Sequence, residues 1–148
     1  MNSDIINIAL ADDDEDDRMI FEEVIDELAM RTKLSLFKNG QELMDYLSLP
    51  NIVLPNLIFL DLNMPIKNGM QCLKEIRQNN ALKNLAVAIY STSSSEKDIE
   101  ETFVNGANIY INKPTNFSNL RDVIEKVLQL NWQYQTSNLN RNTFLFRI

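Results

Sequence analysis

Each of three apolar runs in the sequence is followed directly by charged side chains. Asp12 and Asp13 follow the first run, Asp61 follows the second and Lys113 follows the third. Carboxylates that share one crevice hold a hard cation such as Mg²⁺, which prefers oxygen ligands. An ammonium group beside them neutralises charge on the oxygens of a phosphoryl group, which is the main way a protein assists phosphoryl transfer. These residues therefore predict one site that handles phosphate together with a divalent cation.

Asp61 is the residue that could take the phosphoryl group itself, because a carboxylate that accepts one becomes an acyl phosphate. Ser91, at the end of a fourth apolar run, offers a hydroxyl to the same phosphoryl oxygens. Taken singly, these residues have ordinary explanations: Asp61 could cap a helix or lie in a turn, and residues 12–14 could be a solvated helix start. The joint occurrence of charged residues at three run ends favours a shared site.

Apolar runs alternate with helical periodicity along the chain, which predicts an α/β fold with a doubly wound parallel sheet and crossover helices. We expect five strands, at residues 5–11, 34–37, 57–60, 85–90 and 109–112. A helix is expected after each strand, and the last helix has an apolar stripe from Leu120 to about Trp132. Since the carboxyl ends of strands one, three and five converge near the switch point of such a sheet, the charged residues are expected to meet there.

Short polar motifs mark the expected helix ends. Asn39 lies in a turn into a short second helix, and the three serines at 93–95 give the fourth helix capping hydroxyls. Gly106 is a candidate left-handed cap at the end of that helix. Asn116 and Ser118 are candidate caps at the start of the fifth helix.

The composition limits the classes of function that remain. The 148 residues carry a net charge of −7, which argues against non-specific binding to nucleic acid or to an anionic membrane. The chain has no histidine, which excludes Ser-His and Cys-His catalysis, and its one cysteine, Cys72, is predicted to be a buried apolar residue. No apolar stretch approaches the roughly 18 residues that span a bilayer and no signal-peptide layout is present, so we expect a cytoplasmic protein. Residues 1–135 are predicted as one domain and residues 136–148 as a tail.

Four motifs, taken in order, resemble the receiver domain of two-component response regulators, the chemotaxis-regulator type of fold. They are the acidic pair Asp12-Asp13, IFLDLNMPIKNG around Asp61, AIYSTSSSEKDI around Ser91 and GANIYINKP ending at Lys113-Pro114. The spacings of 30 residues from Asp61 to Ser91 and 22 from Ser91 to Lys113 are also similar to the family's. The resemblance covers residues 5 to about 131 and implies a flavodoxin-like sheet of five strands in the order 2-1-3-4-5 with five helices.

The resemblance implies a role for each charged residue. Asp61 would be the phosphoacceptor, Asp13 a direct Mg²⁺ ligand, and Asp12 a ligand either directly or through water. The backbone carbonyl of Asn63 would supply a further ligand, and Lys113 would pair with the phosphoryl group. Mg²⁺ is the implied cofactor, and a sensor histidine kinase or a phosphotransfer protein is the implied phosphodonor.

The resemblance also implies a conformational switch. Ser91 would be the hydroxyl that moves toward the phosphoryl group, and Tyr110 the aromatic residue that turns inward with it. The change would reach the face formed by the fourth helix, the fifth strand and the fifth helix, and output would occur by contact with an unknown protein rather than with DNA. Ser91 replaces the Thr that is commoner at this position. Thr92 stands where a small residue is usual, and this larger side chain would slow access of a phosphodonor.

Two other classes of protein use similar residues. A phosphatase of the haloacid-dehalogenase type also has an aspartate nucleophile, Mg²⁺, a hydroxyl and a lysine, but it needs a second acid two residues after the nucleophile, where this chain has Asn63. A flavodoxin-like FMN protein would have a phosphate loop rich in glycine and hydroxyls after the first strand, where this chain has an acidic loop. The receiver domain is therefore favoured, with the phosphatase as the alternative.

The C-terminal tail leaves two alternatives open. Its apolar residues Phe144, Leu145 and Phe146 could belong to a frayed terminus or a strap packed on their own domain, or they could dock on a partner or on a second copy of the chain as a homodimer. Together with a long connection at residues 49–56 and the string QLNW near Trp132, the tail is similar to the phytochrome-associated subgroup of stand-alone receivers.

Overall fold

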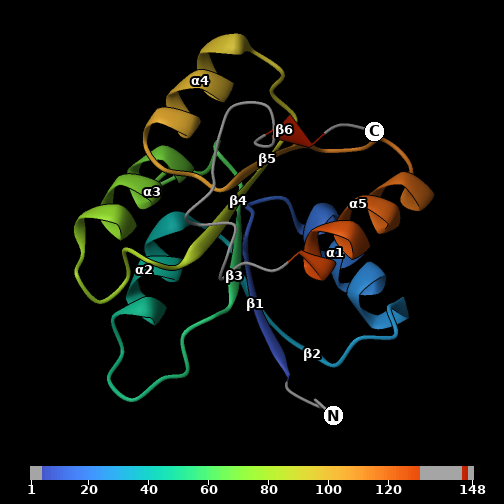
Figure 1. The fold of residues 1–148 in the computed structure, drawn as a ribbon, viewed down its shortest axis with the longest axis horizontal. Coiled ribbons are helices and arrows are strands. Elements are labelled where there is room, and N and C mark those ends of the chain that lie inside the picture. Colours follow the sequence, from blue (N-terminus) through green and yellow to red (C-terminus); the bar gives the residue numbers. More distant parts are fainter. Residues whose placement is uncertain (1–4, 131–144, 147–148) are drawn as a thin grey trace.

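A sheet of six parallel strands forms the centre of the computed structural model, which describes residues 5–130 and 145–146 of the chain (Figure 1). The strands are β1 (Ile6–Ala11), β2 (Thr32–Phe37), β3 (Leu57–Leu60), β4 (Ala86–Ser91), β5 (Ile109–Asn112) and β6 (Leu145–Phe146). Their order in the sheet is β2-β1-β3-β4-β5-β6. The first five strands follow the expected order 2-1-3-4-5, so the predicted flavodoxin-like fold is confirmed.

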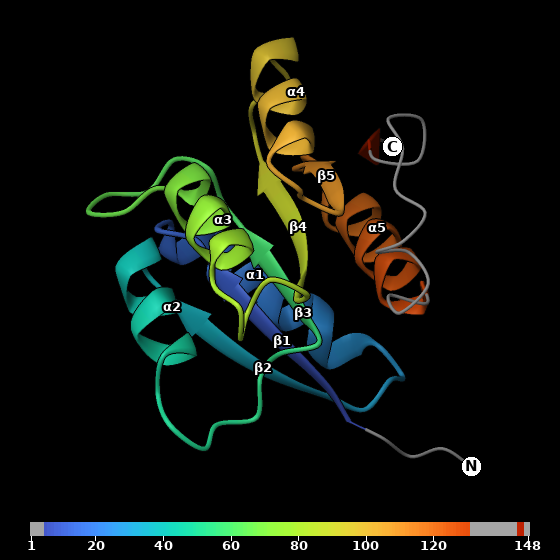
Figure 2. The same ribbon diagram turned by 60° about the vertical axis from the view of Figure 1, so that its left-hand side comes forward.

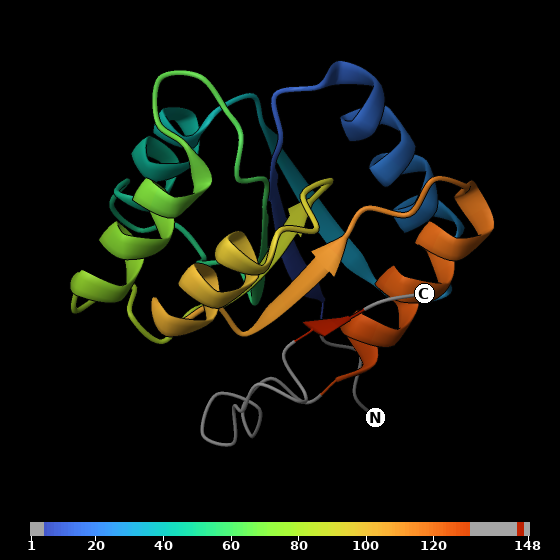
Figure 3. The same cartoon turned by 90° about the horizontal axis from the view of Figure 1, so that it is seen from above.

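Within the described residues, five helices cover the two faces of the sheet. They are α1 (Glu15–Glu27), α2 (Gly40–Leu47), α3 (Gly69–Gln78), α4 (Glu96–Val104) and α5 (Phe117–Gln129). Helices α1 and α5 lie on one face and α2, α3 and α4 on the other, as Figures 1 and 3 show. Figure 2 shows the latter three following one another along their face. None of the described helices is long and apolar enough to span a bilayer.

The burial of the central strands explains their apolar sequences. Every residue of β3 and β4 is buried, as a parallel strand with helices on both faces requires. On the face covered by α1 and α5, the ring of Phe21 packs edge-on against those of Phe59 and Tyr90, with centroids 4.9 and 5.6 Å apart. On the opposite face, Cys72 is buried as predicted, and burial raises the pKa of its thiol to about 12. The thiol is therefore a packing group rather than a nucleophile.

The predicted capping residues are largely confirmed, and Asn39, for which the sequence indicates only a turn, caps a helix as well. Asn39, Ser95 and Asn116 each accept a hydrogen bond from the backbone N–H three residues later, at the start of α2, α4 and α5. Gly106 follows the end of α4 with a φ of 94°, a left-handed conformation that glycine adopts without strain. Ser118, the other candidate for the start of α5, lies inside that helix, so Asn116 alone is its cap.

Several element boundaries differ from the sequence prediction, and β1, for example, begins at Ile6 rather than at residue 5. Strand β2 begins at Thr32, two residues early, because it pairs with β1 over six positions from Ile6 onward. Strand β4 is shifted by one residue and ends at Ser91. Helix α5 ends at Gln129. The expected end, at about Trp132, lies outside the described residues.

A sixth strand that the sequence did not predict lies beside β5. The backbones of Leu145 and Phe146 pair in parallel with Tyr110 and Ile111. At these two residues the tail returns to the edge of its own sheet, which agrees with the strap alternative for that part of the backbone. The predicted domain boundary at residue 135 lies outside the described residues.

Candidate functional site

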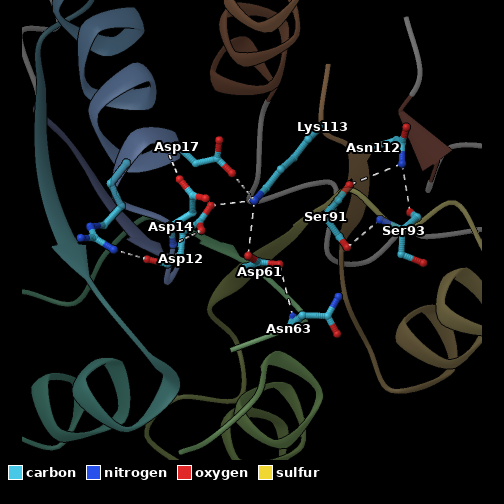
Figure 4. A network of polar contacts seen from close by, with 10 residues as sticks. Asp12, Asp14, Asp17, Asp61, Asn63, Ser91, Ser93, Asn112 and Lys113 are labelled. Atoms are coloured by element: carbon cyan, nitrogen blue, oxygen red, sulfur yellow. Dashed lines mark hydrogen bonds and ion pairs between the residues drawn. The ribbon is translucent and has the colours of Figure 1, made fainter. Parts of the chain in front are cut away.

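The register of the sheet brings the predicted charged residues to its carboxyl edge. The N–H of Asp61 donates to the carbonyl of Ala11 at 3.0 Å, so Asp61 leaves the sheet beside Asp12. The N–H of Lys113 donates to the carbonyl of Ser91 at 2.8 Å, which keeps the end of β5 against the end of β4. Figure 4 shows these residues gathered at one edge, as the switch-point argument predicts.

The Lys113 ammonium lies among three carboxylates. Its Nζ is 2.8 Å from Oδ2 of Asp12, 2.9 Å from Oδ2 of Asp17 and 3.3 Å from Oδ2 of Asp61 (Figure 4). The same Nζ lies 5.0 Å from the centroid of the Tyr90 ring, whose negative face favours a cation. Only 9% of the Lys113 side chain is exposed, so water screens these contacts weakly. Lys113 therefore ties the ends of β1, β3 and α1 together.

Burial and neighbouring charges change the pKa of both Asp61 and Lys113. Burial raises the pKa of Asp61 to about 6, the Lys113 ammonium opposes that rise, and the charge of Asp12 adds to it. Burial alone would lower the pKa of Lys113, but its hydrogen bond to Asp12 and the charges of both acids outweigh burial and raise it. Lys113 is therefore a cation at neutral pH, whereas Asp61 gains a proton more easily than an ordinary aspartate does.

Three carboxylates lie close enough together to bind one cation. Oxygens of Asp12, Asp13 and Asp61, which we call the site carboxylates, all lie within 4.8 Å of one another. Asp12 and Asp61 are buried and Asp13 is exposed, so the group opens to solvent on one side. Mg²⁺ takes oxygen ligands in an octahedron and keeps several waters, which three carboxylates at an open edge allow. The residues therefore fit the divalent cation that the sequence predicts.

Asp14 and Arg18 hold the loop between β1 and α1 in place. Oδ1 of Asp12 accepts from the N–H of Asp14 at 3.0 Å, and the Asp12 carbonyl accepts from Nη1 of Arg18 at 2.8 Å. The Asp14 side chain caps α1 by accepting from the N–H of Asp17 at 2.9 Å. These bonds orient both Asp12 and the first turn of α1 toward Lys113.

The segment that follows Asp61 packs closely against it. The N–H of Asn63 donates to Oδ1 of Asp61 at 3.3 Å, and the N–H of Gly69 donates to the carbonyl of Leu62 at 3.0 Å. A Cβ at Gly69 would lie 2.2 Å from the Asp61 carbonyl oxygen, so only glycine fits at the start of α3. This close approach holds the backbone of Asp61 and of the residue that follows it.

Ser91 and Tyr110, the two predicted switch residues, contact the same residue of the β4–α4 loop. Both are fully buried. Oγ of Ser91 accepts from the N–H of Ser93 at 3.1 Å, and the Tyr110 hydroxyl donates to the Ser93 carbonyl at 2.8 Å. Nδ2 of Asn112 donates to that carbonyl as well, at 3.0 Å. A movement of the Ser91 hydroxyl would therefore act on a loop that also holds Tyr110.

Sequence reasoning did not assign Asp17, Tyr90 or Asn112 to the site. Asp17 lies in the first turn of a helix that begins directly after the acidic pair, and this position is a signal that could have found it. Tyr90 directly precedes Ser91, and Asn112 directly precedes Lys113. Because side chains alternate between the two faces of a strand, the sequence does not indicate that Tyr90 and Asn112 reach the site as well. Their contacts depend on how neighbouring strands are placed, which no short motif encodes.

Comparison with known proteins identifies the family. The sequence model of the family described as the response regulator receiver domain matches residues 8–125 of this chain. The response regulator Rcp1 of Synechocystis is 32% identical over 124 residues, which cover 81% of this chain and 84% of Rcp1. Similar solved structures include phosphorylated RcpA, a cyanobacterial phytochrome response regulator, which is 29% identical, with a TM-score of 0.79 over 93% of this chain and 98% of that one. They also include the Mn²⁺-bound form of Rcp1, which is 31% identical, with a TM-score of 0.75 over 82% of this chain and 91% of that one. The chain therefore belongs to the response regulator receiver domain family.

These relatives agree with two finer predictions. RcpA is a phytochrome response regulator, which supports the subgroup indicated by the sequence of the tail and of the 49–56 connection. Rcp1 has been solved with Mn²⁺ bound, which agrees with site carboxylates that fit a divalent cation. The matches do not favour the phosphatase alternative, since the family that they identify is one of signalling response regulators.

Proposed function

We propose that this receiver domain accepts a phosphoryl group on Asp61 and that the modification changes its contacts with other proteins. The observation that carries this proposal is a buried carboxylate with the Lys113 ammonium 3.3 Å from its Oδ2, beside a second buried carboxylate, Asp12. A carboxylate oxygen of Asp61 would attack the phosphorus of a phosphohistidine on the donor protein. The O–P bond would form as the P–N bond breaks, and the imidazole nitrogen would keep the electron pair.

The surrounding residues supply the positive charge that this transfer needs. The site carboxylates would hold Mg²⁺, with the Asn63 carbonyl as a further ligand, and the bound cation would neutralise charge on the transferred oxygens. Lys113 would donate to one oxygen of the same phosphoryl group. Ser91 would donate its hydroxyl to another oxygen. The transfer would therefore depend on Mg²⁺, because two buried acids otherwise repel the incoming anion.

The site favours holding a phosphoryl group over repeated hydrolysis. A phosphatase of the haloacid-dehalogenase type needs an acid two residues after its nucleophile to protonate the leaving group, and the Asn63 side chain cannot do this. We therefore expect only self-catalysed phosphorylation and dephosphorylation of Asp61, without turnover of phosphate esters.

Phosphorylation would then bias an equilibrium between two conformations. When the Ser91 hydroxyl turns toward the phosphoryl group, its bond with the N–H of Ser93 is lost. Since Tyr110 is bound to the carbonyl of the same residue, the loop and the ring would move together. The face formed by α4, β5 and α5 would present the changed surface to an output protein.

The phosphodonor that we propose is a histidine kinase of the phytochrome type, or a phosphotransfer protein that works with one. Similarity to RcpA, a phytochrome response regulator, supports this choice. The expected cytoplasmic location and a homodimer formed through the tail stay predictions.

Phosphorylation by a small molecule tests the proposal directly. The full chain is incubated with Mg²⁺ and acetyl phosphate, and its intact mass is compared for the wild type, Asp61→Asn and a control, Asp26→Asn, which changes an exposed acid of α1. We expect the mass of one phosphoryl group to be gained by the wild type and the control but not by Asp61→Asn. A gain that survives in Asp61→Asn, or none in the wild type, would contradict the proposal. Sustained release of phosphate from monoesters would favour the phosphatase.

A further inference from the structure

Asp17 contacts Lys113 in a way that the proposed phosphoryl transfer does not use. Its Oδ2 lies 2.9 Å from Nζ of Lys113, closer than Oδ2 of Asp61 at 3.3 Å. Figure 4 shows Asp17 reaching the ammonium from α1, while Asp61 reaches it from the end of β3. Asp17 is not one of the site carboxylates, so its contact with the lysine needs an explanation of its own.

The Lys113 ammonium has no donor to spare for a phosphoryl oxygen. An ammonium group has three N–H donors. Three carboxylates, those of Asp12, Asp17 and Asp61, already lie within hydrogen-bond distance of it. While all three are ionised carboxylates, Lys113 can therefore bind an oxygen of an incoming phosphoryl group only when one of them gives up its bond.

Asp17 is the carboxylate that can leave most easily. The Asp12 side chain is 0% exposed and that of Asp61 is 9% exposed, whereas that of Asp17 is 36% exposed. A buried carboxylate that loses its partner stays without one, which is strongly unfavourable. An exposed carboxylate exchanges its partner for water at little cost. Asp17, which approaches the ammonium from α1, is therefore the carboxylate that a phosphoryl oxygen replaces most easily.

We propose that Asp17 is a positioning residue, which holds the Lys113 ammonium in place of a phosphoryl oxygen and releases it when Asp61 is phosphorylated. This inference rests on the proposed function of Asp61. In the unmodified protein, Asp17 keeps Lys113 aimed at the site. It also competes with the phosphoryl group for one N–H and places a further negative charge near the incoming anion. Removing the Asp17 carboxylate should therefore strengthen binding of a phosphoryl group.

Asp16 provides a matched control for a simpler explanation, in which Asp17 only places a negative charge at the start of a helix. Both residues lie in the first turn of α1, where an acid favours the helix dipole. Asp16 is exposed, and it is not among the acids of the described residues that form a hydrogen bond or ion pair with Lys113. The variants Asp16→Asn and Asp17→Asn remove the same charge from the same turn, so a difference between them reports the contact with the lysine.

The test measures binding of beryllofluoride, an analogue of the phosphoryl group, to the full chain in the presence of Mg²⁺. Its affinity and the ¹⁹F NMR signals of the bound fluorines are recorded for the wild type, Asp17→Asn, Asp16→Asn and Asp17→Glu. We expect Asp17→Asn to bind about three- to tenfold more tightly than Asp16→Asn, because a charge-assisted hydrogen bond no longer competes for Lys113. Its fluorine signals should also shift, whereas Asp17→Glu, which keeps a carboxylate, should stay within about twofold of the wild type.

The outcomes separate this inference from the function on which it rests. If the wild type binds beryllofluoride in an Asp61-dependent way but Asp17→Asn binds no more tightly than Asp16→Asn, the positioning role of Asp17 is wrong and the proposed function stands. If the wild type does not bind at all, the proposed function fails and this inference fails with it. Asp17→Ala gives a second variant for the same comparison, since alanine is a good helix former.

Discussion

Lys113 and Arg77 are two largely buried cations at opposite ends of the sheet, and their partners differ in kind. Lys113 lies among three carboxylates at the carboxyl edge. Arg77, in the last turn of α3, donates to neutral oxygens near the amino ends of β4 and β5. These acceptors are the carbonyls of Gly106 (2.9 Å), Lys83 (3.0 Å) and Leu85 (2.6 Å) and the side-chain oxygen of Asn108 (2.9 Å). Burial lowers the pKa of Arg77, whereas that of Lys113 is raised.

The difference shows which cation can change partners. A backbone carbonyl has a fixed place, so the planar fork of Arg77 clamps the end of α3 to β4 and to the α4–β5 loop. Asn108 extends the clamp, because its side-chain oxygen also accepts from the N–H of Val87 at 2.8 Å. A carboxylate can bind a lysine, a proton or a metal ion, so each partner of Lys113 has an alternative. One edge of the sheet is therefore held rigidly, and the other is able to respond to a ligand.

Removing the clamp should give the largest effect on stability. Arg77→Ala leaves several carbonyls without a donor, so we expect the free energy of unfolding to fall by about 3 kcal/mol. Binding of beryllofluoride with Mg²⁺ should stay within about twofold of the wild type, because the site lies at the other edge. Urea denaturation and a binding titration check both. Arg77→Lys is the control: it keeps the charge but loses the fork, and a fully stable Arg77→Lys would show that charge alone suffices.

Removing the buried charge of Asp61, at the carboxyl edge of the sheet, should raise the free energy of unfolding rather than lower it. The pKa of Asp61 is about 6 in the folded protein against an ordinary 3.8, so the folded state holds this proton more tightly than the unfolded chain does. Ionised Asp61 therefore lowers stability above about pH 6, and this loss disappears as the pH falls toward the ordinary pKa. Without divalent cations, Asp61→Asn should be more stable than the wild type by about 1–2 kcal/mol at pH 7 and by much less at pH 4. A pH-independent difference would contradict this explanation.

Binding of Mg²⁺ should produce the smallest of the three changes in the free energy of unfolding. At a Mg²⁺ concentration of about five times its dissociation constant, the wild type should gain about 1 kcal/mol of stability. Asp13→Asn should gain less, because it lacks the exposed site carboxylate, while Arg77→Ala should gain as much as the wild type. Thermal melts with and without Mg²⁺ measure this. An equal gain in wild type and Asp13→Asn would place the cation elsewhere.

The fold and the residues at the strand ends were predictable because their signals are local. Apolar runs bounded by polar residues indicate the first five strands, and the order of acid, acid and base along the chain indicates the shared edge. The sixth strand was not predictable, since a two-residue pairing leaves no periodicity to recognise. The clamp at Arg77 was missed for a similar reason. Its acceptors are mostly backbone carbonyls, which every residue carries.

The sequence by itself determined which chemical groups end the strands, and so the class of chemistry around Asp61. Only the tertiary structure decided how those groups share partners. Lys113 is 101 residues from Asp12 and 96 from Asp17, and its ammonium contacts both because β1, α1 and β5 end at the same edge of the sheet. Residue types fix charge and hydrogen-bonding capacity, but competition for three N–H donors depends on distances and burial, which exist only in the folded chain.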